Sequence, residues 1–189
     1  MLPTKNLRRR LGWRSNLAPV LLFPALLWAA GPAAAPPAPR RLHLWSPALR
    51  PGKPIPRRFT CSGQDTSPPL RWAGVPAGTQ ALALHVFDRD AGGFTHWLIW
   101  NLPPESRGLP PGVATTARAA GGVQGQNSWR TLGYGGPCPP PGLPHHYVFA
   151  LYALKLQLTL PPGATRDEFR AAIVGHIASQ ARLVALFGR

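Results

Sequence analysis

Apolar residues come in four dense runs, separated by segments rich in glycine and proline. The runs are RLHLWS (41–46), ALALHVFD (81–88), THWLIWNL (95–102) and HYVFALYALKLQL (146–158). Aromatic and β-branched residues dominate them, and these residue types pack well on a pleated surface. Gly92 and Gly93 lie in the short segment between the second and third runs, which are therefore expected to be antiparallel neighbours. The pattern predicts a mostly β protein with an antiparallel β-sandwich.

One segment near the C-terminus has helical spacing instead. Thr165 and Glu168 fit the capping box T-x-x-E, in which the two side chains satisfy the first free amides of a helix. The apolar residues that follow recur every three or four positions: Phe169, Ile173, Ile177, Ala181 and Val184. The sequence therefore predicts a C-terminal helix that closes the chain.

The first 35 residues have the organisation of a secretory signal peptide. Basic residues come first, an apolar run follows at 17–30, and small residues follow at 31–35. The basic residues are Lys5, Arg8, Arg9, Arg10 and Arg14. A membrane anchor is the alternative, but the run is short and holds two prolines, whereas crossing the hydrocarbon core takes about 20 apolar residues. No cysteine lies near the cleavage region, which argues against a lipoprotein. We expect an exported protein, periplasmic or secreted, that meets the membrane only through its signal peptide.

The remaining residues suffice for a single domain. We expect a short linker at 36–43 and one domain at 44–189. The whole chain carries a formal charge of +15, and loss of the five signal-peptide cations lowers it to +10. Such a surplus can indicate a nucleic-acid surface, but the arginines are scattered along the chain without a dense run. No nucleic-acid partner is therefore expected, and the oligomeric state is left open.

Cys61 and Cys138 are the two cysteines of the chain. An even number of cysteines in an oxidising compartment favours a disulfide. The alternative is two separate buried thiols that pack as small hydrophobes. A zinc site would need at least a third ligand, and neither cysteine belongs to a C-x-x-C pair.

Polar side chains gather at the ends of the predicted strands. Asp88 ends the second run and His96 opens the third, so a hairpin of this length brings both to the same end of the sheet. A loop rich in glycine and proline (133–144) leads into the last run at His145, His146 and Tyr147. Strand alternation places His145 and Tyr147 on one face and His146 on the other.

Three stretches resemble the phosphatidylethanolamine-binding protein family, in its bacterial Raf-kinase-inhibitor-like branch. They are TCSGQDTSPPLRWAGVPAGTQALAL, DRDAGGFTHW and GYGGPCPPPGLPHHYVFALYAL, and the resemblance runs from about residue 44 to residue 187. It implies a β-sandwich with a small, preformed pocket at one end that receives phosphate or a phosphorylated head group. Relatives are associated with the inhibition of kinases or proteases, so the rim of the pocket is a possible contact surface for a protein partner.

The resemblance also implies a set of ligand-binding residues. Asp88 and Asp90 match the two acids of the family motif D-P-D-A-P, and His96 matches the histidine before its tryptophan. Gly136 and Pro137 match the G-P pair of the loop, while His145 and Tyr147 match the ends of the element H-x-Y. The chain departs from these motifs at three positions: Arg89 and Gly92 replace both prolines of the first motif, and His146 replaces the arginine usual in the last.

The chemistry of these side chains supports an anion site. Two imidazoles, the Tyr147 hydroxyl and the backbone N–H groups of the loop can donate to a small anion. Asp88 cannot bind an anion while it is ionised, so we expect it to orient a histidine. Alternatively, His96 and His145 are strand-end residues whose nitrogens are satisfied by the backbone.

A binding protein without a cofactor or a metal is the function expected from these residues. The competing class is a hydrolase or a metal-dependent enzyme that uses the Asp/His/Tyr cluster. The sequence has no G-x-S-x-G or H-E-x-x-H motif and no serine next to either histidine, which argues against catalysis.

Overall fold

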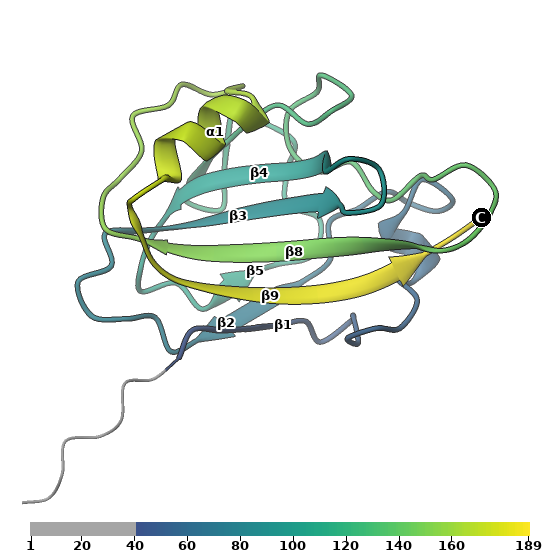
Figure 1. The fold of residues 1–189 in the computed structure, drawn as a ribbon, viewed down its shortest axis with the longest axis horizontal. Helices are drawn as coiled ribbons and strands as arrows, with labels where there is room; N and C mark the ends of the chain where they lie inside the picture. Colours follow the sequence, from purple (N-terminus) through teal and green to yellow (C-terminus); the bar gives the residue numbers. More distant parts are fainter. Residues whose placement is uncertain (1–40) are drawn as a thin grey trace, which may run out of the picture. The chain divides into compact units, whose positions relative to one another are not determined.

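The computed structural model describes residues 41–189 of the chain. Two antiparallel sheets form the framework of this part (Figure 1). The smaller sheet has the order β1-β2-β5, with β1 at His43–Trp45, β2 at Leu70–Ala73 and β5 at Gly108–Leu109. The larger sheet has the order β6-β7-β4-β3-β8-β9. Its strands are β3 (Ala81–Asp88), β4 (Phe94–Leu102), β6 (Arg118–Ala119), β7 (Gly122–Gln124), β8 (His145–Leu154) and β9 (Ile177–Phe187). The predicted fold class is confirmed.

The predicted signal peptide and residues 36–40 of the predicted linker lie outside the described range. No helix within that range combines the length and the apolar character needed to cross a membrane.

Both faces of the larger sheet are buried. Leu84, Trp97 and Phe149 point to one face and join the core shared with the smaller sheet. Their strand neighbours Leu98 and Ala150 point to the other face, which packs under the helix. Residues on successive positions of a strand face opposite sides. A strand that is buried on both sides therefore needs an unbroken apolar run, which explains the composition of β3, β4 and β8.

Helix α1 (Arg166–Ile173) covers the second face of the larger sheet (Figure 1). The predicted capping box is present: the Thr165 hydroxyl accepts from the Glu168 amide, and the Glu168 carboxylate accepts from the Thr165 amide. Phe169 and Ile173 are buried against the sheet. Burying such a pair stabilises the fold by about 3 to 6 kcal/mol relative to leaving both side chains exposed.

The prediction that this helix closes the chain is wrong. Helix α1 ends at Ile173, Gly175 takes a positive φ of 77°, and residues Ile177–Phe187 form strand β9. This strand pairs with the whole length of β8, from His145 opposite Phe187 to Leu154 opposite Ile177. Four is an even number, so an i, i+4 repeat is compatible with strand alternation as well as with a helix. The buried residues of β9 recur every second position, at 183, 185 and 187.

Four short strands, two in each sheet, were missed by the sequence pattern. Strands β2, β5, β6 and β7 have two to four residues each, and a 3-10 turn, η1, covers Arg57–Phe59. Elements this short contain at most two side chains per face, so they show no measurable period. The last predicted strand also ends earlier than expected, at Leu154.

A disulfide joins Cys61 to Cys138 and thereby ties two distant loops together. The Cys61 amide also donates to the Pro137 carbonyl, at 3.2 Å. The disulfide expected from the cysteine count is confirmed, and no free cysteine remains in the described part of the chain. The bond closes a loop between residues that are 77 positions apart.

Replacing both cysteines by serine is expected to lower the free energy of unfolding by about 4 kcal/mol, because the open loop gives the unfolded chain more conformations. Urea unfolding of the wild type and of the double variant measures this difference. As a control, thiol titration of the unfolded, unreduced wild type is expected to find no free thiol. Two free thiols per chain would show that the bond does not form.

Candidate functional site

The turn between β3 and β4 holds the Asp88 carboxylate in place. Asp88 is the last residue of β3, and its Oδ1 accepts from the amides of Asp90 and Ala91 at 2.9 and 3.2 Å. The Gly93 amide donates back to the Asp88 carbonyl. Gly92 and Gly93 have positive φ values of 62° and 79°, which the closing residues of this turn require. The turn thus fixes one carboxylate oxygen of Asp88 and leaves the other one for a partner.

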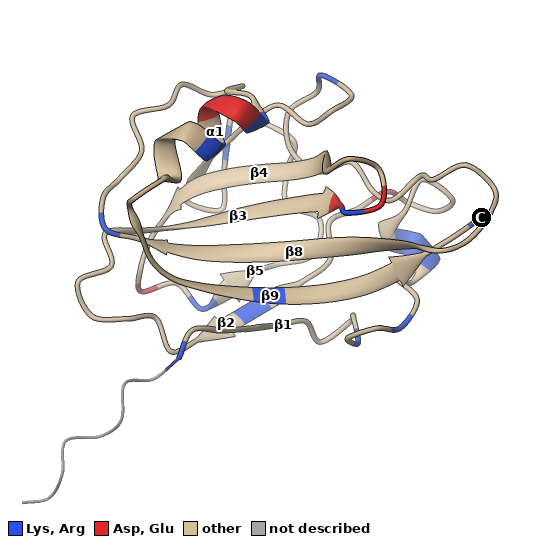
Figure 2. Cartoon of the chain, viewed as in Figure 1, with Lys and Arg blue, Asp and Glu red and all other residues tan. Residues whose placement is uncertain are grey.

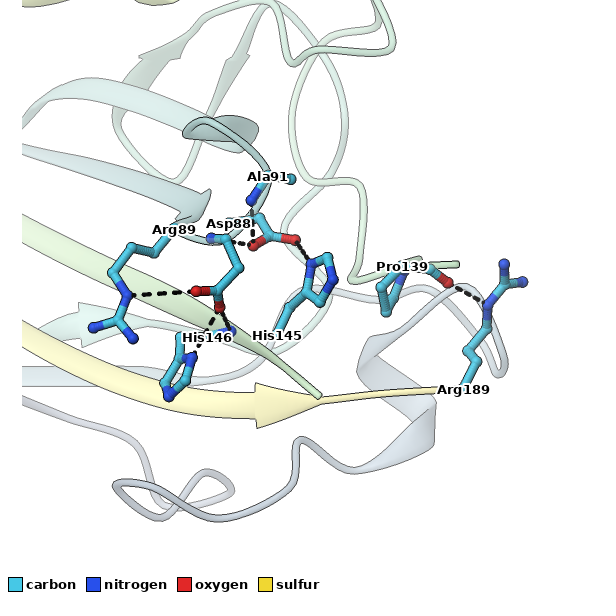
Figure 3. Close-up of polar contacts among 8 residues, drawn as sticks. Asp88, Arg89, Ala91, Pro139, His145, His146 and Arg189 are labelled. Atoms are coloured by element: carbon cyan, nitrogen blue, oxygen red, sulfur yellow. Dashed lines mark hydrogen bonds and ion pairs between the residues drawn. The ribbon is translucent and has the colours of Figure 1, made fainter. Parts of the chain in front are cut away.

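That partner is His145, the first residue of β8. Its Nδ1 lies 2.7 Å from Oδ2 of Asp88 (Figure 3). Strands β3 and β8 are paired with Asp88 opposite Tyr147, so the register brings the two side chains to the same end of the sheet. The Asp88 side chain is 4% exposed and the His145 side chain 22%. Because Nδ1 donates to the carboxylate, Nε2 is the nitrogen of His145 that is free to meet a ligand.

His96, on β4, is held in a similar way by the backbone. Its Nδ1 donates to the Gly135 carbonyl at 2.8 Å. Burial lowers the pKa of His96, although the Gly135 carbonyl and the Asp88 carboxylate act in the opposite direction. At neutral pH the imidazole is therefore uncharged with its proton on Nδ1, and Nε2 carries a lone pair. His96 becomes a second donor toward an anion only when it takes up a proton.

Tyr147, on β8, has a buried hydroxyl without a hydrogen-bond partner among residues 41–189. Burial and the nearby Asp88 carboxylate raise the pKa of this hydroxyl well above its usual value, so it remains protonated. Leaving a buried hydroxyl unpaired costs about 1 to 3 kcal/mol, and such groups are uncommon in folded proteins. The ring of Tyr147 packs edge-on against His96, with 5.1 Å between the ring centroids.

These side chains line one cavity of about 270 Å³. Asp88, His96, His145 and Tyr147 form its polar part. Its other lining residues are mainly apolar: Ala91, Phe94, Trp129, Cys138, Pro139 and Pro140. Trp129 is 44% exposed and lies at the edge of the cavity, with its ring 5.0 Å from that of His96. The cavity thus combines a polar floor with apolar walls.

The loop that follows Gly135 forms one wall of the cavity. Gly136 and Pro137 are not in the lining: the Gly136 amide donates to Oδ1 of Asp65 at 2.7 Å. A side chain at position 136 would collide with Asp65 and with the Phe59 carbonyl. The expected backbone donation from Gly136 to an anion is thus directed to Asp65 instead. Gly136 and Pro137 place the residues that do line the cavity, Cys138 to Pro140.

The last residue, Arg189, forms hydrogen bonds with the loop that makes this wall of the cavity. Nε of Arg189 donates to the Pro139 carbonyl at 2.6 Å, as Figure 3 shows. The Gly142 amide donates to the carbonyl of Arg189. Together with the disulfide, these contacts hold the proline-rich wall at three points.

Asp90 lies outside the cavity. Its Oδ2 accepts from the amide and from Nδ1 of His146, at 2.6 and 2.8 Å, and these hydrogen bonds lower the pKa of Asp90. Side-chain exposures of 37% and 40% place both residues at the surface (Figure 3). The structure thus brings Asp88, His96, His145 and Tyr147 of the sequence-based set into one cavity. Asp90 instead pairs with His146, which strand alternation had placed on the other face.

Several lining residues were missed by the sequence reasoning, above all Trp129. Its loop is organised by Asn127, whose Oδ1 accepts from the amides of Trp129 and Thr131. An asparagine that caps its own turn is a recognisable signal, and it could have drawn attention to the exposed aromatic residue two positions later.

The chemical capacity of the site is that of a small polar cradle. Its lining has no serine, threonine or free cysteine, so the side chains in it that could act as nucleophile or acid/base are those of Asp88, His96, His145 and Tyr147. Among residues 41–189 there is no group of three histidine, cysteine, aspartate or glutamate side chains placed to hold a metal ion. What the cavity offers is one protonated hydroxyl and two imidazole nitrogens.

Comparison with known proteins identifies relatives of this chain. Residues 45–188 match the family model of the phosphatidylethanolamine-binding protein. A UPF0098 protein of Methanothermobacter thermautotrophicus is 48% identical over 138 residues, covering 71% of this chain and 91% of that protein. A Mycobacterium tuberculosis protein named "Putative lipoprotein LppC" is 44% identical over 157 residues, covering 80% of this chain and 74% of its own.

A solved structure agrees with these sequence matches. The crystal structure of Escherichia coli YbcL, described as a new member of the mammalian family of these proteins, matches with a TM-score of 0.74. The two sequences are 29% identical, and the match covers 79% of this chain and 99% of YbcL.

Proposed function

Because this chain belongs to the phosphatidylethanolamine-binding protein family, we propose that its cavity binds a small phosphorylated anion without transforming it. The ligand class is a phosphorylated head group of the size of phosphoethanolamine. A cavity of about 270 Å³ is small for a ligand site and suits a compact group better than a whole lipid.

The observation that carries the proposal is the unpartnered hydroxyl of Tyr147 in the lining of the cavity. A phosphate oxygen is a strong acceptor, and a bound phosphate would satisfy this buried donor. Because the hydroxyl stays protonated, it can donate a hydrogen bond to an anionic acceptor. The hydroxyl makes no hydrogen bond to another residue among residues 41–189, so its proton is available to a ligand.

The two histidines supply the remaining donors. Nε2 of His145 is directed away from Asp88, and the carboxylate makes an ion pair with the imidazole when His145 is protonated. The charge on a bound phosphate favours proton uptake by His96, whose Nδ1 is already engaged with Gly135. Both Nε2 atoms would then donate charge-assisted hydrogen bonds to the ligand.

The lining has no serine, threonine or free cysteine to form a covalent intermediate, which supports binding rather than hydrolysis. The alternative is acid/base catalysis by the Asp88–His145 pair. Hydrolysis of a chromogenic phosphate ester that is lost in the His145→Gln variant would establish that alternative.

Binding outside the cytoplasm is part of the proposal. The Cys61–Cys138 disulfide is typical of oxidising compartments. The mycobacterial relative carries a lipoprotein name, which supports the same location. In such a compartment the protein would meet phosphorylated head groups rather than cytoplasmic kinases.

Replacing His96 or His145 by glutamine is expected to weaken phosphoethanolamine binding at least about tenfold, because each change removes a charge-assisted hydrogen bond worth about 1.5 to 3 kcal/mol. His146→Gln is the matched control, since this imidazole contacts Asp90 outside the cavity, and its affinity is expected to equal that of the wild type. Titration calorimetry on the four proteins measures these affinities. Equal affinity for the wild type, His96→Gln and His145→Gln would show that the two histidines are structural.

Affinity is also expected to weaken as the pH rises. Free His96 has a pKa below the ordinary value of 6.5, and a bound anion stabilises its imidazolium form. Binding therefore takes up a proton above the pKa of free His96, and the affinity levels off below that pKa. Glycerophosphoethanolamine is the suitable probe, because a phosphodiester lacks the second phosphate proton that titrates near pH ~6.

Calorimetry from about pH 5 to pH 8 covers the range in which histidine titrates. The His96→Gln variant is expected to lose the part of the dependence that His96 contributes. A wild-type affinity that is constant over this range would contradict the coupling of ligand binding to histidine protonation.

A further inference from the structure

A second concave site lies on the helix-covered face of the larger sheet, between α1 and the strands β3, β8 and β9. It is a groove of about 440 Å³ and shares no lining residue with the anion cavity. We propose that this basic groove binds a single-chain amphiphile, with its anionic head group among three arginines and its chain against the exposed apolar residues beside them. The proposal is independent of the function proposed for the anion cavity.

Three arginines supply the positive charge of the basic groove. Arg166 and Arg170 come from α1 and Arg182 from β9, and all three are in the groove lining. Figure 2 shows basic residues both on α1 and on β9, and on these two elements the acidic residues lie only at the start of α1. The positive charge thus comes from two elements that face the same hollow.

This charge is only partly neutralised. Nη1 of Arg166 donates to the carbonyls of Gly92 and Gly93, and its Nε contacts Asp167. Arg170 and Arg182 make no ion pair among residues 41–189. The chain has six acidic residues, and only Asp167 and Glu168 lie on α1. Glu168 is engaged in the helix cap, so two guanidinium groups remain to meet an external anion.

The arginine charges affect the pKa values of two residues at the floor of the basic groove, His85 and Tyr152. Burial, followed by the charges of Arg166 and Arg170, lowers the pKa of His85 to about 3. His85 is therefore neutral and bonds to the Thr95 hydroxyl. Burial raises the pKa of Tyr152, and the charges of Arg182 and Arg170 oppose that shift. His85 and Tyr152 line the basic groove together with the three arginines, which accounts for the influence of the guanidinium charges on both pKa values.

An apolar patch adjoins the arginines. Val174 is 72% exposed and Ile177 is 36% exposed, and both line the basic groove. They are two of the five large hydrophobic residues that are exposed among residues 41–189. Beneath them lie Ile173 and Phe87. Exposed apolar residues next to charged side chains in a concave surface are typical of a ligand-binding groove.

The arginines and the apolar patch together indicate which class of ligand fits the basic groove. Arginines alone would suit inorganic phosphate, since guanidinium groups bind phosphate through paired N–H donors. Valine and isoleucine alone would suit an uncharged chain. An alkyl phosphate or an alkyl carboxylate matches both halves, and the volume of the groove lies in the range of small-molecule sites.

Decyl phosphate, kept below its micelle-forming concentration, is the probe for this proposal. Titration calorimetry measures its affinity, and the part of the binding that depends on arginine reports the basic groove, because no arginine lines the anion cavity. The Arg170→Gln/Arg182→Gln double variant is expected to bind decyl phosphate at least about tenfold more weakly than the wild type, because two charged donors are lost. Arg118→Gln, which removes an exposed cation on β6 far from the groove lining, is the matched control and is expected to leave the affinity unchanged.

A second variant tests the apolar half of the site. Val174→Ser changes an exposed side chain and is expected to weaken decyl phosphate binding severalfold, with the thermal unfolding midpoint unchanged. Inorganic phosphate is expected to bind the wild type at least about tenfold more weakly than decyl phosphate, because it lacks the buried chain. Equal decyl phosphate affinity for the wild type and the double arginine variant would overturn the proposal. So would binding that occurs with anionic lipid vesicles but not with the monomeric amphiphile.

Discussion

The Asp88 carboxylate is the group on which the anion cavity depends. One oxygen accepts from the turn amides of Asp90 and Ala91, and the other accepts from His145. A single side chain therefore sets the shape of the β3–β4 turn and the orientation of the imidazole at the start of β8. Because it is almost fully buried, these hydrogen bonds are little weakened by water. Of the other polar groups in the cavity, the Tyr147 hydroxyl is a donor, and Nε2 of His96 becomes one when the imidazole takes up a proton.

The sequence predicted those parts of the molecule whose pattern is long or chemically specific. Strands β3, β4 and β8 are buried on both faces, and their apolar runs are visible without any structure. The cluster of Asp88, His96, His145 and Tyr147 followed from strand ends and alternation. The helix was extended too far because Ile173, Ile177 and Ala181 fit both a helical and a strand repeat. Short strands such as β2 and β5 carry too few residues for a period, and the position of Trp129 depends on a loop whose fold is set by tertiary contacts.

The β3–β4 turn borders both the anion cavity and the basic groove. On one side it carries Asp88 and the floor of the anion cavity. On the other side the carbonyls of Gly92 and Gly93 receive the Arg166 guanidinium, which anchors the start of α1. Within a few residues the turn directs the amides of Asp90 and Ala91 to Asp88 and the carbonyls of Gly92 and Gly93 to Arg166, and the positive φ values of the two glycines allow this course of the backbone. The fold thus places the cavity lined by Asp88 and the basic groove on either side of one hairpin.

The central claim is that the Tyr147 hydroxyl, which makes no hydrogen bond to another residue among residues 41–189, donates to a phosphorylated ligand. The most direct test is the free energy of unfolding of the wild type and of Tyr147→Phe, each with and without saturating phosphoethanolamine. Without ligand, the phenylalanine variant is expected to be at least as stable as the wild type, by up to about 1 kcal/mol, because a buried unsatisfied donor is gone. With ligand, it is expected to gain less stability than the wild type. A variant that is less stable without ligand and is stabilised equally by phosphoethanolamine would contradict the account.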